Sequence, residues 1–178
     1  MSDRPAGVDL RFLDALAGLK GGDFSRLAPL FASQGAALPP IMRWHIQGRF
    51  RDHPFELAEA LTCACFVGAT DVAEYLLAQG LDASGGIGTG LNAVHWAANR
   101  GQPAAVRLLI ARHAPLETRN MYGGTVLGCA VWSAVHEPRA GQIEAIEALL
   151  EAGAVVSEAE YPSGDARVDE MLRRYGRG

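Results

Sequence analysis

The chain has 178 residues, a hydrophobic fraction of 49%, a charged fraction of 20% and a formal net charge of −4. This composition is typical of a single folded domain with its own core, and it excludes a largely disordered chain. No apolar run approaches the roughly 20 residues of a membrane-spanning helix, residues 1–5 do not resemble a secretory signal, and the mild acidity disfavours nucleic-acid binding.

The first repeat-like segment covers residues 8–37, in which Leu30-Phe31 and Gly35-Ala36 resemble residues 76–77 and 80–81 further along the chain. The spacing leaves about 12 extra residues, and we assign residues 38–53 to an inserted finger. Its part from Arg43 to Arg51 interleaves arginines with aromatic residues. Three interpretations are open: an extended structural finger with Trp44 and Phe50 packed on the rest, a protein contact, or a stacking site for single-stranded nucleic acid. We favour the structural finger.

A period of 33 residues follows and is the main signal in the chain. Residues 64–68, 72–73 and 75–77 align without a gap to residues 97–101, 105–106 and 108–110. Apolar residues recur at i, i+3, i+4 and i+7 within each period, which predicts two short helices with one buried face. Helix pairs of this kind cannot bury their faces alone, so the segments 54–86 and 87–119 must stack on each other and on their neighbours.

A third copy, residues 120–158, starts with the same spacing of 33 residues, but its second half lies further along the chain than this spacing predicts. Residues 125–127 lie 33 positions beyond residues 92–94, but Gly141 lies 40 beyond Gly101, which places an insertion at residues 132–140. We expect glycine to end the second helix of three copies, at Gly35, Gly80 and Gly153. Residues 159–178 predict a turn and a capping helix that places Val168, Met171 and Leu172 against the stack and polar residues toward water.

Two other features are open to structural or chemical interpretation. The glycine-rich run from Ser84 to Gly90 precedes a helix and could hold phosphate, but no strand comes before it and no Gly-Lys-Ser/Thr follows. We expect an inter-repeat turn.

The three cysteines, Cys63, Cys65 and Cys129, predict small buried side chains in a reducing compartment. We expect no metal site and no cofactor, and the excess of Arg over Lys suggests a GC-rich bacterial genome.

The central copy resembles the ankyrin repeat family. Residues 90–101, Gly-Leu-Asn-Ala-Val-His-Trp-Ala-Ala-Asn-Arg-Gly, look like G-x-T-P-L-H-x-A-A-x-x-G, and residues 106–114 are similar to V-x-L-L-L-x-x-G-A. The resemblance implies an all-α ankyrin-repeat solenoid of about four helix-turn-helix repeats with a C-terminal capping helix. It also implies that His95 is a structural core histidine. Asn92 and Ala93 depart from the usual Thr-Pro, and His113 replaces a capping glycine.

The resemblance further implies a binding surface. Phe66, Asn99 and Trp132 are 33 residues apart, at a position that points into the concave groove of ankyrin-like repeats. Two interpretations are open, contact with a ligand or local packing, and we favour contact. We therefore expect a non-enzymatic, cytoplasmic protein-protein interaction module, monomeric by itself, which binds a partner protein through this groove and the turn tips. The candidate contact residues are Phe66, Val67, Asn99, Arg100, Arg119, Met121, Tyr122, Trp132 and Ser133.

Two alternative functions stay open. One is an antitoxin-like immunity protein that neutralises a partner enzyme, which a toxin-like reading frame beside this one would favour. The other is a small-molecule or minor enzymatic site where the two insertions meet His95, Trp96 and Trp132, which a deep closed pocket would favour. His136 and Glu137 are adjacent and able to do acid–base chemistry, but no nucleophile or second carboxylate comes at a recognisable spacing.

Overall fold

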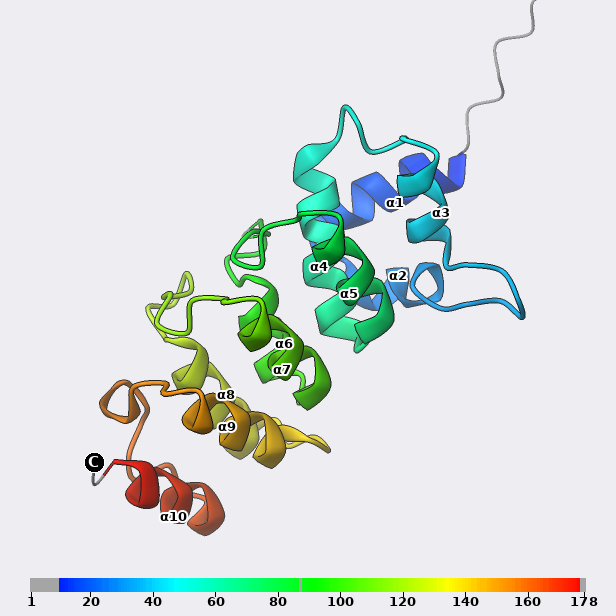
Figure 1. The fold of residues 1–178 in the computed structure, drawn as a ribbon. Coiled ribbons are helices and arrows are strands. Elements are labelled where there is room, and N and C mark those ends of the chain that lie inside the picture. Colours follow the sequence, from blue (N-terminus) through cyan, green and yellow to red (C-terminus); the bar gives the residue numbers. More distant parts are fainter. Residues whose placement is uncertain (1–9, 87, 177–178) are drawn as a thin grey trace, which may run out of the picture.

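The computed structural model describes residues 10–86 and 88–176, and within these ranges it is built from helices without a β-strand. This confirms the predicted all-α solenoid (Figure 1). The α-helices are α1 (Leu10–Gly21), α2 (Phe24–Leu27), α3 (Pro40–Ile46), α4 (Pro54–Val67), α5 (Thr70–Ala78), α6 (Ala93–Asn99), α7 (Pro103–Ala111), α8 (Val126–His136), α9 (Gln142–Glu151) and α10 (Ala166–Tyr175), with 3-10 turns at Ala28–Leu30 and Val156–Glu158. No described helix has the length and apolar character needed to cross a membrane.

The helices stack in two rows along a curved rod (Figure 1). One row contains α1, α4, α6 and α8, each packed on the next, and the other contains α3, α5, α7 and α9. Apolar side chains between the rows form one continuous core in which Leu61, Leu76, Leu109, Leu127 and Leu149 are almost fully buried. Helix α10 packs on α9 and covers the C-terminal end of this core with Val168 and Leu172.

Capping side chains and prolines favour the starts of the helices. The side chains of Asn92, Thr125 and Asp165 accept hydrogen bonds from backbone N–H groups in the first turns of α6, α8 and α10. Pro54 and Pro103 occupy the first turns of α4 and α7, where a missing N–H group costs nothing.

Glycine ends the second helix of two repeats as predicted. Gly80 and Gly153 directly follow the last turns of α5 and α9 with φ angles of 91° and 89°. The prediction for Gly35 was wrong, because α2 ends at Leu27 and Gly35 lies in a later turn. In the repeat between them, His113 adopts a φ angle of 60° at the position where its neighbours have glycine.

The prediction of an extended finger at residues 38–53 was wrong, because residues 40–46 form helix α3. Pro40 begins this helix, and the burial of Ile41 and Trp44 fixes its inner face. The predicted packing of Trp44 and Phe50 is confirmed: both rings lie edge-to-face 5.2 Å from the ring of Phe12. Helix α3 thereby extends the row of α5, α7 and α9 beyond α5.

Each of the three predicted segments 54–86, 87–119 and 120–158 contains one helix pair: α4 and α5, α6 and α7, and α8 and α9. The ends of two other segments, residues 8–9 and 177–178, lie outside the described residues, as does Ile87 in the glycine-rich turn.

Candidate protein-binding surface

Helix α2 covers the first part of the surface that we expected to be open. Its buried Phe24 packs edge-to-face on Phe66 of α4 at 5.6 Å and on Trp96 of α6 at 6.3 Å. Phe66 and Trp96 also contact each other, with ring centroids 5.0 Å apart. Phe66 is therefore half-buried in an aromatic cluster rather than free for a partner. Sequence reasoning missed this role of Phe24, because α2 has no counterpart in the other repeats.

Arg100 lies over this aromatic cluster. Its guanidinium carbon is 4.5 Å from the centroid of the Phe66 ring, a cation–π contact. Burial, and to a lesser degree the nearby charge of Arg139, lower the pKa of Arg100, although an arginine stays charged at neutral pH. Val67, the next residue after Phe66, lines a cavity of about 280 Å³ with Phe31 and other residues near α2.

The C-terminal end of α6 is held by polar side chains from the insertion at residues 132–140 and from α9. The backbone oxygen of Asn99 accepts hydrogen bonds from the Ser133 hydroxyl at 2.8 Å and from the Gln142 amide nitrogen at 3.0 Å. Gln142 also donates to the Ser133 hydroxyl at 2.7 Å and accepts from the backbone N–H of Arg139 at 2.7 Å. These bonds satisfy a helix terminus that would otherwise lack partners.

The prediction that Ser133 faces a partner was wrong. Its side chain is fully buried, and its hydroxyl is bonded within the network at the end of α6. The sequence alignment placed Ser133 beside Val67 and Arg100, but the side chains of Arg139 and Gln142 donate hydrogen bonds to its hydroxyl and cover this position.

Trp132 is the large exposed residue of this region, with 46% of its surface accessible. It lies one residue before Ser133 on α8, and its ring stacks nearly parallel on that of His136, with centroids 4.8 Å apart. His136 is fixed in turn by a 2.8 Å hydrogen bond between its Nδ1 and the Trp132 backbone oxygen. Arg139 follows on the same insertion and pairs with Glu137 at 2.7 Å. An ordered aromatic ring with charged neighbours is typical of a binding anchor.

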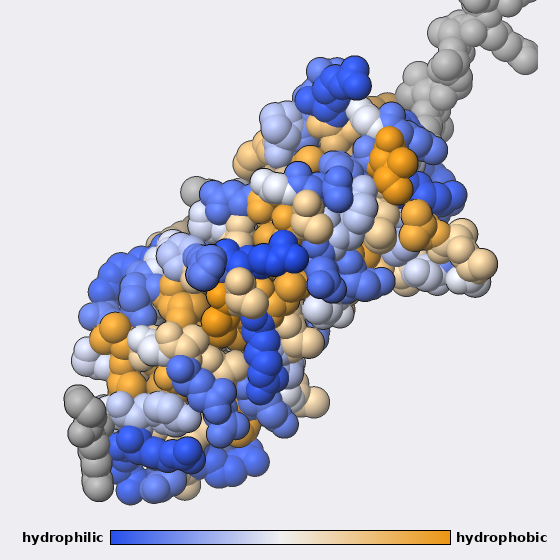
Figure 2. Space-filling view, viewed as in Figure 1, coloured by the Kyte–Doolittle hydropathy of each residue, from blue (hydrophilic) through white to orange (hydrophobic). Residues whose placement is uncertain are grey.

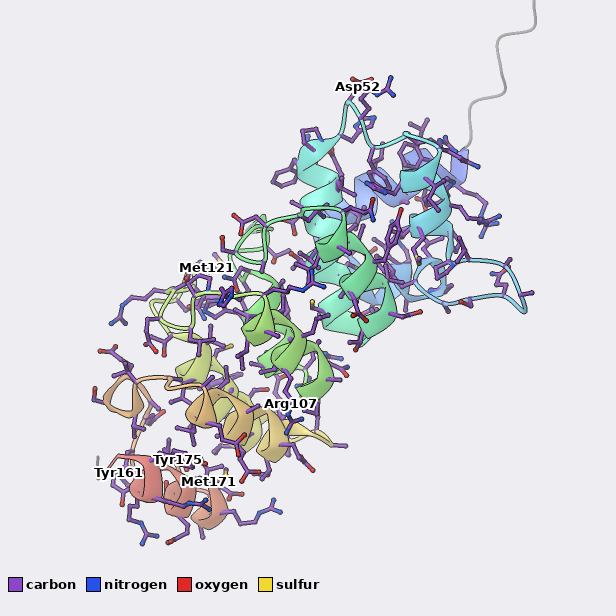
Figure 3. All side chains as sticks on the ribbon, in the orientation of Figure 1. Asp52, Arg107, Met121, Tyr161, Met171 and Tyr175 are labelled. Carbon is purple, nitrogen blue, oxygen red and sulfur yellow. The ribbon has the colours of Figure 1, made fainter. Side chains whose placement is uncertain are left out.

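The turn between α7 and α8, in which Met121 is labelled in Figure 3, carries the three other candidates, Arg119, Met121 and Tyr122. Met121 and Tyr122 project into solvent, with 66% and 80% of their surfaces exposed. The turn itself is ordered, because the Asn120 side chain accepts hydrogen bonds from the backbone N–H groups of Tyr122 and Gly124. Arg119 pairs with Glu158 at 2.5 Å and donates to the Gly123 backbone oxygen at 2.8 Å. Arg119 thus supports the turn, whereas Met121 and Tyr122 are free to contact a partner.

Comparison with known proteins agrees with this geometry. A family model for ankyrin repeats, in three copies, matches residues 31–159. The chain belongs to the ankyrin repeat family. Ankyrin repeats generally mediate protein–protein interactions and are typically non-enzymatic. The comparison with curated proteins found no match.

His95 has the structural role expected of a histidine at this place in an ankyrin repeat. It is almost fully buried, and its Nδ1 lies 2.7 Å from the Asn92 side-chain oxygen, with Nε2 3.4 Å from the Gly124 backbone oxygen. Burial lowers the pKa of His95, so the ring is neutral at pH 7 and has one N–H, which donates either to the Asn92 side-chain oxygen or to the Gly124 backbone oxygen of the next repeat.

The three cysteines of this ankyrin-repeat protein are buried thiols. Burial raises the pKa of all three thiols, to about 12 for Cys65 and about 11 for Cys129, so none is nucleophilic at neutral pH. No group of three or more His, Cys, Asp or Glu able to hold a metal occurs within residues 10–86 and 88–176. A cavity of about 460 Å³ lies beside α10, and neither His95 nor Trp132 is among its lining residues.

Proposed function

We propose that this chain binds a partner protein through the surface formed by α6, α8 and the turn between α7 and α8, with Trp132 as the anchor. The exposure of the ordered Trp132 ring is the observation that carries the proposal. Met121 and Tyr122 add exposed apolar area at the turn, and Arg100 adds a fixed positive charge. In this proposal the chain is a monomer, is located in the cytoplasm and catalyses no reaction.

Preorganisation supports this proposal. The bonds among Asn99, Ser133, Arg139 and Gln142 hold the backbone around Trp132, and the Asn120 side chain holds the turn. A surface that is already ordered loses little conformational entropy when a partner binds. The contact set that we retain is therefore Asn99, Arg100, Met121, Tyr122 and Trp132, with Phe66, Val67, Arg119 and Ser133 as supports.

Replacing the anchor tests the proposal. A partner is first captured from cells of the native source and identified by mass spectrometry, and its affinity is then measured by calorimetry. We expect Trp132→Ala to weaken binding by about 2 kcal/mol or more, as the loss of an aromatic anchor does. The matched control is Tyr161→Ala, which removes an exposed aromatic ring near α10.

Thermal unfolding of the same variants separates binding from folding. We expect Trp132→Ala to keep the helical content and the melting temperature close to those of the wild type. An unchanged affinity together with a lower melting temperature would show that Trp132 packs within the fold instead of contacting a partner.

A further inference from the structure

Helix α3 has two different faces. One packs within the solenoid, and the other is exposed. The inner face buries Ile41 and Trp44, and His45 bonds to the Tyr75 hydroxyl of α5 at 2.8 Å. The outer face carries Arg43 and Ile46, which are neighbours because they are three residues apart on a helix. Ile46 has 61% of its surface exposed, and Met42 lies half-buried one turn before it.

The segment that contains α3 is positively charged. Residues 38–53 contain three arginines and one aspartate in a chain whose formal net charge is −4. Arg43 and Arg51 are exposed, and neither forms an ion pair with any of the residues that the structure describes. The neighbouring helix α5 carries the exposed Asp71 and Glu74, but neither is bonded to these arginines.

An apolar area therefore lies over α3 with hydrophilic residues around it (Figure 2). We call Met42, Arg43, Ile46 and Arg51 the α3 patch. Arg51 belongs to it because its guanidinium lies beside the turn that ends α3: a Cβ built at Gly48 would be 3.7 Å from a terminal nitrogen of Arg51, and the Arg51 N–H donates to the Gly48 backbone oxygen at 3.2 Å.

Nucleic acid does not fit the α3 patch. Binding of single strands uses aromatic rings on which the bases stack. Trp44 and Phe50 are buried around Phe12, and the Arg49 guanidinium lies 4.2 Å from the Phe12 centroid, so the aromatic rings of this segment face the core. Ile46, the aliphatic side chain of the patch, has 61% of its surface exposed, which suits a protein partner better than a phosphate backbone.

We propose that the α3 patch docks an acidic segment of a partner protein, one that presents an apolar side chain to Ile46 and carboxylates to Arg43 and Arg51. Charge complementarity carries this choice, since an unpaired guanidinium binds a carboxylate through paired, charge-assisted hydrogen bonds. The apolar contact would exclude water from the ion pairs and strengthen them. The α3 patch lies at the N-terminal end of the solenoid, so this docking is independent of the Trp132 surface.

Selection from a display library of short random peptides tests the proposal. The library is selected in parallel on the full wild-type chain and on a triple variant, Arg43→Ala, Ile46→Ser and Arg51→Ala. Circular dichroism checks the fold of the variant, which changes only exposed side chains. We expect peptides recovered with the wild type alone to combine acidic and apolar residues, and to bind the triple variant about tenfold more weakly or worse.

Two controls and two further probes complete the experiment. Arg107→Ala removes an exposed arginine on α7, outside the α3 patch (Figure 3), and should leave peptide binding unchanged. Trp132→Ala should leave it unchanged as well, which separates this docking from the proposed function. Oligothymidine and vesicles that contain phosphatidylserine serve as the further probes.

The proposal is overturned if no peptide distinguishes the wild type from the triple variant, or if the recovered peptides lack acidic residues. It is also overturned if oligothymidine or the anionic vesicles bind the wild type, lose binding with Arg43→Ala and Arg51→Ala, and keep it with Ile46→Ser. That pattern would make the patch a general polyanion site.

Discussion

Glu59 is a carboxylate buried where the ankyrin motif has a threonine. It aligns with Asn92 and Thr125, which start α6 and α8, but α4 begins five residues before it at Pro54. One Glu59 oxygen accepts a hydrogen bond from the Gly88 N–H at 2.8 Å, and the other has no hydrogen-bond partner among the described residues. Burial raises the pKa of Glu59, so its ionised form is disfavoured in the folded chain.

We predict that Glu59→Gln stabilises the protein at neutral pH relative to the wild type. A raised folded-state pKa means that the folded chain binds the proton more tightly than the unfolded chain does. The wild type therefore loses free energy of unfolding as pH rises above the ordinary value of 4.5, until the folded-state pKa is passed. Glutamine does not ionise and escapes this loss. Urea unfolding of both proteins between pH 4 and 8 measures the difference.

The matched control is Glu74→Gln on the exposed face of α5. Its difference from the wild type should stay small across the same pH range. If the difference for Glu59→Gln does not grow with pH, then the Glu59 carboxylate is not disfavoured by burial, and its bond to Gly88 offsets the desolvation.

At the scale of one helix, His113 adopts a backbone conformation that suits glycine. Its φ of 60° lies in the left-handed region, where Gly80 and Gly153 are found after the equivalent helices. The His113 side chain is exposed, and it makes no hydrogen bond in the described structure. We predict that His113→Gly raises the free energy of unfolding by about 1 kcal/mol, measured by urea denaturation.

The reverse substitution is the control for this element. Gly80→Ala places a Cβ where nothing lies within 4 Å, so its effect reports backbone strain alone. It should lower the free energy of unfolding by about 1 kcal/mol. A loss of stability for His113→Gly would mean that the histidine side chain makes a contact that outweighs its strain.

The insertion between α8 and α9 depends on Gln142. Its buried amide bonds to the Asn99 backbone oxygen, the Ser133 hydroxyl and the Arg139 N–H. We predict that Gln142→Ala lowers the free energy of unfolding by about 1–3 kcal/mol, because buried polar groups are left without partners. Gln79→Ala, on an exposed glutamine at the end of α5, is the control and should be nearly neutral. An equally neutral Gln142→Ala would mean that water replaces its bonds.

These elements show how far sequence reasoning reached. The helix pairs from α4 to α9 repeat, so their apolar spacing and the ankyrin motif predicted them together. The segments that form α2 and α3 do not follow the 33-residue period, so no periodic pattern revealed that Phe24 covers Phe66 or that residues 40–46 are helical. Alignment alone placed Ser133 on the surface, since the burial of this position depends on how the following insertion folds.

Over the whole molecule, each helix pair contacts mainly its neighbours along the rod. Stability in such a solenoid is close to a sum of repeat terms and interface terms, so a defect at a central interface affects both halves. Leu109 is a central test, because it is fully buried on α7, the helix that packs between α5 and α9.

We predict that Leu109→Ala lowers the free energy of unfolding by about 2–5 kcal/mol, through lost apolar burial and the cavity left between repeats. Leu13→Ala on α1 is the matched control, because Leu13 has 48% of its surface exposed and should lose far less. Tryptophan fluorescence follows the unfolding, since Trp44, Trp96 and Trp132 lie in the N-terminal, central and C-terminal parts of the rod. A loss near zero for Leu109→Ala would mean that the repeats do not stack through this residue, which would remove the rigid frame that the proposed binding surface requires.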